Sequence, residues 1–508
     1  MNSTNPSSAD RAPADAPGAT TGKTGTGTAV SPDPIDSRPG GIGLLMTVLI
    51  TAAIAFQLNA SMLSPVLATM ARELNTDEAA TGLTQTAFFT GGAMCGLFLP
   101  RLSDIVGRRK ILVIMLGVMS LGGLIAALAP NIGVLMVARA MQGIAGPTIP
   151  MTLIILRSQV KEEVRLGTLM GLLAAINGGV AGIDVILAGW LAENYGFRSV
   201  FWLIAIIGII ATVVVAFGTP ESKPSDNVKM DWAGAALLVI SVLCITLGVN
   251  EAGKAGEANW LYVIAMLIIG PAVFLGFWKY EGRHSQPLVA PKYLARRHTW
   301  ALLATTVLTM TGVFAAVNGV AISLAQNPDA GFGLEADKAS LWLLTPYALV
   351  GWAVGPFAGR WAPKVGYGRL VIIANIASAV LMLGLAFVGV KSLAVLVIIV
   401  ILLGVTYAGV GNIVINNLGV VNSPKDNEGF LPGMNSAGFN LGAGVSFAIL
   451  PVFQVAGSPQ GSDSVAGYTT AFIAAAVILG IAAAVASLIP QADCRGARPR
   501  HRLNHTPI

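Results

Sequence analysis

From Ile42 onward the chain consists of apolar runs of about 20 residues, separated by short polar connections. A helix of about 20 residues is about 30 Å long, which is the thickness of the hydrocarbon core of a bilayer. We therefore predict about fourteen membrane-spanning helices. Their expected ranges are 42–70, 80–100, 111–129, 132–156, 166–192, 199–218, 233–249, 261–279, 300–325, 340–361, 369–389, 392–416, 434–456 and 468–489. Only 11% of the residues are charged, compared with roughly 25% in soluble domains, so we expect an all-α integral membrane protein.

The two ends of the chain differ from its apolar body. Residues 1–40 are rich in Ser, Thr, Ala, Asp, Pro and Gly with few large apolar side chains, so we predict a disordered tail. No apolar core follows within roughly the first thirty residues, which argues against a signal peptide. Residues 490–508 are expected to form a second tail, which is basic.

A weak internal repeat indicates how the helices are grouped. Pro100-Arg101-Leu102 with Gly107 resembles Gly359-Arg360-Trp361 with Gly366, and the two arginines are 259 positions apart. The same shift moves the start of the first helix onto the start of the ninth. We therefore predict two six-helix bundles as parallel repeats, residues 41–218 and 300–489, with a linker at 219–299 that contributes two extra helices.

The cations of the connections indicate the orientation of the helices, because Lys and Arg are retained on the cytoplasmic side of a membrane. They gather in alternate connections and in the C-terminal tail. The cations that we assign to the cytoplasm are Arg101, Arg108, Arg109, Lys110, Arg157, Lys161, Arg165, Lys279, Arg283, Lys292, Arg296, Arg297, Arg360, Lys364, Arg369, Arg495, Arg498, Arg500 and Arg502. We expect a multi-pass protein of the cell membrane with both termini in the cytoplasm. The net charge of +6 reflects this placement and does not indicate nucleic-acid binding.

One connection carries a pattern beyond its charge. Asp104 is followed by Gly107, Arg108 and Arg109, and Arg101 precedes it. The spacing closely resembles the motif Gly-x-x-x-Asp-x-x-Gly-Arg-Arg, which lies between the second and third helices in the major facilitator superfamily, although Pro100 replaces the first glycine. The resemblance implies a gating loop that steadies the junction between the two halves. The alternative reading is that its charges only set the topology.

The layout over residues 42–489 resembles the fourteen-helix drug–proton antiporter branch of that superfamily. Local similarities are Thr219-Pro220-Glu221-Ser222, Asp231-Trp232-Ala233-Gly234 and the stretch from Gly433 to Gly442. The resemblance implies the major facilitator fold, with two bundles and two inserted central helices. It does not identify the substrate, because one fold hosts many functions.

Two charges stand well inside the predicted helices, where a charge is costly and marks a functional candidate. Arg139 lies in a stretch that resembles the fourth-helix motif of the family, and in related antiporters that arginine is tied to proton transfer. Asp184 lies in the fifth helix. Counted from the predicted helix ends, both lie roughly 10–12 Å deep, so we hypothesise that they share a proton-coupling site. A static buried pair is the alternative.

The chain departs from the antiporter pattern at two places. The fifth-helix motif Gly-Pro-x-x-Gly-Gly is missing, and Asp184 stands in its place. In the first helix Asn59 replaces the acid that many relatives carry, and an amide does not titrate. The first departure weakens the case for export, and the second removes a proton carrier.

Side-chain amides are the remaining polar groups of the spans. Most amides in membrane helices bond between helices, but some are expected to line a central substrate cavity. The candidates are Asn59, Gln142, Asn177, Asn318, Asn412 and Asn416. Asn412 and Asn416 are one turn apart and should share a face.

These features together predict a secondary transporter that works by alternating access. Our first hypothesis is a proton-coupled antiporter for efflux of small organic or drug-like compounds, of the multidrug-resistance type. The alternatives are proton-coupled uptake of an organic solute, such as an aromatic acid, and a membrane receptor that transports nothing. The sequence has no phosphate-binding loop, Cys/His cluster or nucleophile elbow, so we expect no enzyme activity, metal or cofactor. The expected partners are the solute, protons and lipid, and the expected state is a monomer.

Overall fold

The computed structural model describes residues 41–76, 78–160, 162–221, 229–252, 258–284, 287–289, 291–423, 430–458 and 464–490. Every regular element in these residues is a helix. The tail predicted at 1–40 and all of the tail predicted at 490–508 except Pro490 lie outside the described residues.

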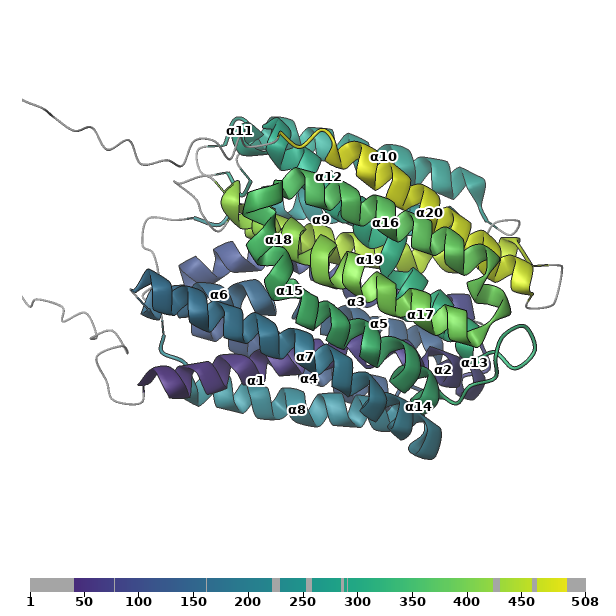
Figure 1. Cartoon of the computed structure of the whole chain (residues 1–508). Coiled ribbons are helices and arrows are strands. Elements are labelled where there is room, and N and C mark those ends of the chain that lie inside the picture. The colour runs from purple at the N-terminus through teal and green to yellow at the C-terminus, as the bar shows by residue number, and fades with distance from the viewer. Residues whose placement is uncertain are drawn as a thin grey trace, which may run out of the picture.

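The helices of the first half of the chain and of the insertion follow one another through short connections (Figure 1). The first half contains α1 (Gly41–Ser61), η2 (Ser64–Val66), α2 (Leu67–Glu73), α3 (Glu78–Val106), α4 (Arg108–Ala127), α5 (Ile132–Gly143), α6 (Thr148–Gln159), α7 (Glu163–Tyr195) and α8 (Phe197–Gly218). The inserted segment contains α9 (Trp232–Ala252), α10 (Trp260–Glu281) and α11 (Pro291–Leu294).

The second half contains more irregular helices than the first. Its elements are α12 (Arg297–Ala315), η4 (Ala316–Ala321), α13 (Ile322–Gln326), α14 (Ala336–Ala339), η5 (Ser340–Leu344), α15 (Thr345–Val365), α16 (Tyr367–Phe387), η6 (Gly389–Lys391), α17 (Leu393–Leu403), η7 (Gly404–Gly411), α18 (Asn412–Val421), α19 (Phe430–Ala456) and α20 (Val465–Ala486). The segments η4, η5 and η7 are π-helical turns inside longer helices. Such turns interrupt the regular hydrogen-bond ladder and are frequent at functional sites.

The prediction of about fourteen membrane-spanning helices is confirmed approximately. Twelve helical stretches of the described residues are long and apolar enough to cross a membrane. The helices α3 and α7 have 29 and 33 residues, so they are also long enough to cross a membrane. Both lie within the same bundle as the other helices. The predicted ranges agree with the helices to within a few residues; for example, the range 199–218 is α8.

Two predicted spans are broken where the sequence contains helix-breaking residues. The first span stops being α-helical at Ser61, and the 3₁₀ turn η2 with Pro65 leads into α2. The span predicted at 132–156 is interrupted between Gly143 and Pro147, where α5 ends and α6 has not begun. A proline lacks the N–H that a continuous helix requires, so both breaks have a local cause.

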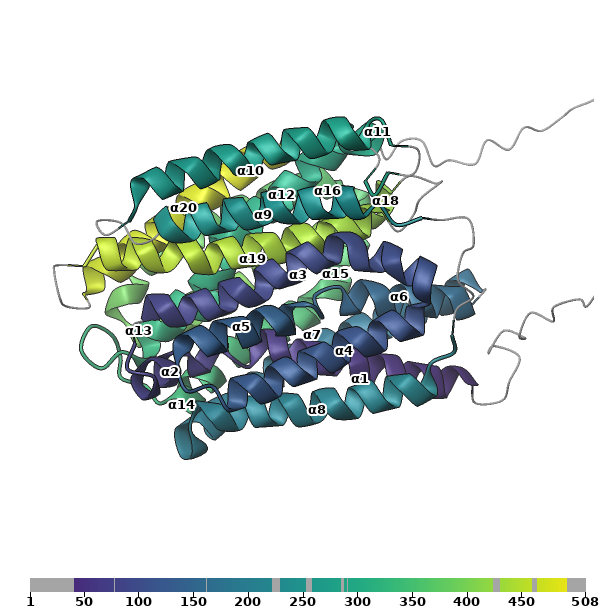
Figure 2. The ribbon, with the colours of Figure 1, turned by 180° about the vertical axis from the view of Figure 1, so that it is seen from behind.

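The apolar cores follow the two halves. Two clusters of buried side chains consist of residues from the first half, and a third lies within the second half. The largest cluster joins them, because it combines Phe88, Phe89 and Val185 with side chains of α12, α19 and α20. The inserted helices α9 and α10 pack on each other at the edge of the molecule, and α9 contacts α3 and α19 (Figure 2).

We name the two ends of the molecule by their connections. The basic end carries the connection between α3 and α4, and α1 begins and α20 ends there (Figure 1). The start of α12 lies at this end too, since Arg297 Nε donates to the Leu488 carbonyl at 2.9 Å. The far end carries α2, α13 and α14 (Figure 1).

The two halves meet closely at the far end. Gln326 Nε2 donates to the Pro65 carbonyl oxygen across the boundary at 3.0 Å. A methyl group on Gly189 of α7 would lie only 2.7 Å from the Ala336 carbonyl oxygen. Nearer the basic end the same helix has room, because a methyl group on Gly179 or Gly171 would meet nothing within 4 Å. The halves are therefore closely packed at the far end, whereas α7 itself is less tightly surrounded toward the basic end.

Candidate functional site

Arg139 is the largest fully buried side chain of the described residues. Its Nη1 donates to Asn59 Oδ1 at 2.6 Å and to Gln142 Oε1 at 2.8 Å, and its Nη2 donates to Gln85 Oε1. Its guanidinium carbon lies 4.2 Å from the centroid of the Phe88 ring, a cation–π contact. Arg139 thus joins α1, α3 and α5 through amide oxygens, and no carboxylate of the described residues pairs with it.

Asp184 is the second deep charge, and the residue is 4% exposed. The Ser61 hydroxyl at the end of α1 donates to its Oδ2, while its Oδ1 is buried without a hydrogen-bond partner. The Ser61 hydroxyl also lies 2.7 Å from the Gln57 carbonyl oxygen. A hydroxyl carries one hydrogen, so Ser61 can donate fully to the carboxylate or to the carbonyl, but not to both.

The direct ion pair that we hypothesised between Arg139 and Asp184 is absent from this structure. Both charges bind the last turns of α1 instead, Arg139 at Asn59 and Asp184 at Ser61. These two positions differ by about 3 Å along a helix, which agrees with the similar depth expected from the sequence. The pairing fails because α7 packs on α1 and α8, whereas α5 packs on α3 and α4.

Sequence reasoning missed two partners of this site, Gln85 and Ser61. Gln85 is fully buried and lies in a stretch of α3 without charges. A side-chain amide among apolar residues of a membrane helix indicates a polar partner on another helix, so the sequence does contain a signal for Gln85. Ser61 follows Asn59 by two positions, and nothing in its spacing pointed to Asp184, which is 123 residues away in sequence.

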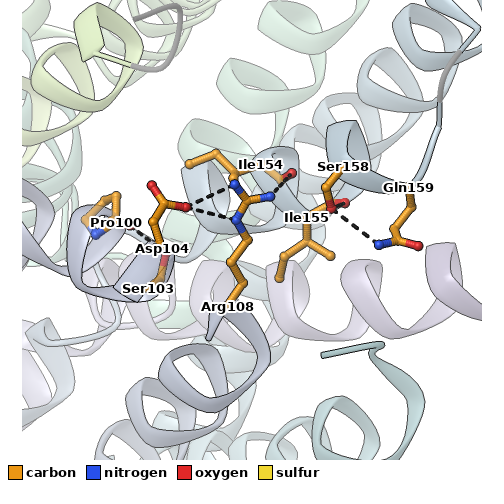
Figure 3. A network of polar contacts seen from close by, with 8 residues as sticks. All are labelled: Pro100, Ser103, Asp104, Arg108, Ile154, Ile155, Ser158 and Gln159. Carbon is orange, nitrogen blue, oxygen red and sulfur yellow. Dashed lines mark hydrogen bonds and ion pairs between the residues drawn. The ribbon is translucent and has the colours of Figure 1, made fainter. Parts of the chain in front are cut away.

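The loop for which the sequence predicts a gating role has a defined set of contacts at the basic end (Figure 3). Asp104 Oδ1 lies 3.0 Å from Arg108 Nη2 in an i,i+4 ion pair. Arg108 Nη1 also donates to the Ile154 carbonyl oxygen of α6 at 3.5 Å. The carboxylate thus aims the arginine of α4 at the end of α6.

The other members of the predicted loop bind other segments. Arg109 Nε lies 3.4 Å from Glu221 Oε2, and its Nη1 donates to the Thr219 carbonyl oxygen after α8. Arg101 Nη1 donates to the carbonyl oxygen of Pro287, in the segment before α11. Gly107 has φ +119°, a conformation that favours glycine, and Gly366 has φ +101° at the matching position of the internal repeat.

The predicted cavity amides separate into two groups. Asn59 and Gln142 are fully buried and hold Arg139, so they do not line open space in this structure. Asn318 is half-buried, and its Nδ2 donates to the Phe314 carbonyl oxygen at 3.0 Å. Asn177 lies in α7, and its side chain is outside the described part of the chain.

Asn412 and Asn416 share a face, as their spacing predicts. Asn416 Nδ2 donates to Asn412 Oδ1 at 2.9 Å. Asn435 of α19 donates to Asn416 Oδ1 at 3.1 Å and accepts from the Thr306 hydroxyl at 2.6 Å. This polar chain links α12, α18 and α19 inside the second half.

A run of aromatic rings connects the two halves. Phe56 contacts Phe88, which contacts Phe89, and the Phe89 ring lies 5.1 Å from Phe314 and 6.3 Å from Phe447. The sixth ring of the run is that of Phe439, 5.8 Å from Phe314. Phe88, Phe89 and Phe447 are buried, whereas the other three rings are half-buried.

Comparison with known proteins identifies relatives over most of the chain. A model of the Major Facilitator Superfamily matches residues 49–447. The chain is 43% identical over 470 residues to the uridine/deoxyuridine transporter of Lactococcus lactis subsp. cremoris (strain MG1363), covering 91% of this chain and 98% of that protein. It is 26% identical over 417 residues to the multidrug resistance protein Stp of Mycobacterium tuberculosis (strain CDC 1551 / Oshkosh), covering 80% of this chain and 75% of that protein.

Solved structures with the same fold include two transporters. The human organic anion transporter MFSD10 (TETRAN) aligns with a TM-score of 0.59 at 13% identity, over 88% of this chain and 100% of that chain. A mutant of the nucleoside transporter NupG aligns with a TM-score of 0.58 at 14% identity, with the same coverage. At these identities the likeness shows the fold alone. The family model, the bundle of membrane-length helices and relatives that are transporters rather than enzymes all agree, and the chain belongs to the major facilitator superfamily.

Proposed function

We propose that this transporter takes up nucleosides of the uridine type. The observation that carries the proposal is the 43% identity to a uridine/deoxyuridine transporter over nearly the full length of both proteins. Relatives named for multidrug resistance share only 24% to 26% identity over shorter stretches, which favours nucleoside uptake over our first hypothesis of drug efflux. The missing fifth-helix antiporter motif points in the same direction.

Proton coupling by Asp184 and Arg139 is part of this proposal. Protonating Asp184 would remove a buried charge that no cation of the described residues neutralises. The Ser61 hydroxyl would then be free to donate to the Gln57 carbonyl, which loosens the contact between α1 and α7. Arg139 keeps a fixed charge beside this site, and its amide partner Asn59 lies two positions from Ser61.

We propose that the protein lies in the cell membrane as a monomer with its basic end and both termini in the cytoplasm. The cations of the connections and the even number of helices support the orientation. In that orientation, closure at the far end means that the described conformation is shut toward the outside. Alternating access would then require the halves to part at the far end and to close at the gating loop.

The function is tested by radiolabelled uridine uptake in cells that lack their own nucleoside transporters. Expression of this chain is expected to raise the initial rate of uptake, and excess unlabelled deoxyuridine should compete. Export of a cationic dye from the same cells is the matched assay for the drug-efflux hypothesis. Dye export without uridine uptake would overturn the proposal.

The gating loop gives a separate prediction, since Asp104→Asn keeps the shape of the side chain and removes its charge. An exposed i,i+4 ion pair is worth only about 0.3–0.5 kcal/mol, so the substitution should leave the amount of inserted protein unchanged. If Asp104 steadies the loop during closure, the turnover rate should nevertheless fall several-fold with little change in KM. Uridine transport at wild-type turnover in Asp104→Asn vesicles would leave the loop with a topological role only.

A further inference from the structure

The aromatic run between the halves contains one ring with an unusual environment, that of Phe314 on α12. It contacts Phe89 of the first half and Phe439 and Phe447 of the second. The three interplanar angles are 85°, 74° and 78°, so all of these contacts are edge-to-face. No ring of the described residues lies parallel over Phe314, although its side chain is only half-buried.

A flat solute that stacked on Phe314 would use a face that no other aromatic ring of the described residues covers. An aromatic ring binds a nucleobase by parallel stacking, and the interaction tolerates a change of base because every base has a π-face. The position of Phe314 is suitable for a transported solute, because helices α3 and α19, which carry its ring partners, run side by side where the halves meet (Figure 2). The base would therefore lie between the halves.

A polar group for the edge of the base lies one turn away. Asn318 Nδ2 uses one hydrogen on the Phe314 carbonyl oxygen, which fixes the amide beside the ring. Its Oδ1 has no hydrogen-bond partner among the described residues. Uracil presents an N–H between two carbonyl oxygens, and that group can donate to an amide oxygen.

The same ring run leads from Phe314 to the buried cation. Phe89 touches Phe314 and Phe88, and the face of Phe88 covers the guanidinium of Arg139 at 4.2 Å. A solute stacked on Phe314 would thus be separated from Arg139 by three rings, those of Phe314, Phe89 and Phe88. Contacting side chains therefore connect the proposed base-binding residue with the first half of the transporter.

We propose that Phe314 stacks on the base of the transported nucleoside and that Asn318 binds the edge of that base. This inference rests on the proposed nucleoside uptake and adds the residues that select a planar, aromatic base. It predicts that the transporter prefers uridine to 5,6-dihydrouridine, whose ring is not flat and stacks poorly.

The test is Phe314→Leu, which removes the ring but keeps apolar bulk in the core. We expect the KM for uridine to rise about tenfold, while the KM for 5,6-dihydrouridine changes little. Phe314→Tyr keeps the ring and should retain the preference for uridine. Phe387→Leu is the control, because Phe387 is 56% exposed on α16 and contacts no ring of the residues that the structure describes.

The outcomes separate the two proposals. If Phe314→Leu changes both nucleosides equally, or changes neither, the stacking role is wrong while nucleoside uptake stands. If the wild-type protein transports neither nucleoside, the proposed function fails, and the stacking role fails with it. The ratio of the two KM values also distinguishes recognition from a folding defect, since a loss of folded protein lowers both rates without changing that ratio.

Discussion

Asp184→Asn is expected to abolish the accumulation of uridine against its gradient while exchange of uridine across the membrane continues. The amide has nearly the shape of the carboxyl group and can still accept from Ser61, but it does not take up a proton. A carrier that has lost its proton site still moves solute down its own gradient. The measurement compares accumulation under an inward proton gradient with counterflow in vesicles preloaded with unlabelled uridine.

A control on the same helix separates this effect from a general loss of charge. Glu193 lies in the last turns of α7 and is exposed, so Glu193→Gln should accumulate uridine as the wild type does. Accumulation at the wild-type level in Asp184→Asn would remove Asp184 from the coupling mechanism. Loss of both accumulation and counterflow would indicate that the residue serves substrate binding or folding instead.

Arg139→Met is expected to produce the largest loss of stability of any substitution considered for this chain. It leaves the amide oxygens of Asn59, Gln85 and Gln142 buried without their donor. One unsatisfied buried acceptor costs about 1–3 kcal/mol, so three should cost at least about 3 kcal/mol. Little folded protein should reach the membrane. The loss is measured as a lower melting temperature and a smaller monodisperse fraction of the protein purified in detergent.

Two further variants make the Arg139 prediction specific. Arg139→Lys keeps the charge and three donors but loses the planar fork, so it should fold better than Arg139→Met and transport more slowly than the wild type. Arg198→Met removes an arginine whose side chain is 40% exposed, and which pairs with Glu73 at 3.3 Å and donates to the Ala129 carbonyl oxygen, so it should cost much less than Arg139→Met. A melting temperature of Arg139→Met equal to that of Arg198→Met would contradict the structural role of the buried network.

The helices of this protein could be predicted from the sequence because the membrane imposes a length on them. A helix must carry about 20 apolar residues to span the bilayer, and the range predicted at 199–218 therefore matches α8 closely. The repeated loop was also visible, and Gly107 and Gly366 both have positive φ at the corresponding places. Pro65 indicates a helix break in the sequence, but hydropathy alone predicts one continuous span over residues 42–70.

The site was only partly predictable, since hydropathy and depth fix the height of a residue but not its direction around the helix. Arg139 and Asp184 lie at similar height, yet each binds a different residue at the end of α1, Asn59 and Ser61 respectively. Which helices are neighbours is decided by packing over the whole bundle, and no local pattern contains that information. Gln85 and Ser61 were missed for the same reason, because their importance comes from partners 54 and 123 positions away.

The central claim is that uridine enters together with protons, and the most direct measurement is substrate-driven proton movement. Purified protein is reconstituted in vesicles that contain a pH-sensitive dye, with no initial pH gradient and with the membrane potential clamped. Uridine added outside is predicted to acidify the lumen in vesicles with wild-type protein and to leave it unchanged with Asp184→Asn. Uridine entry without any pH change, or with alkalinisation of the lumen, would contradict the account.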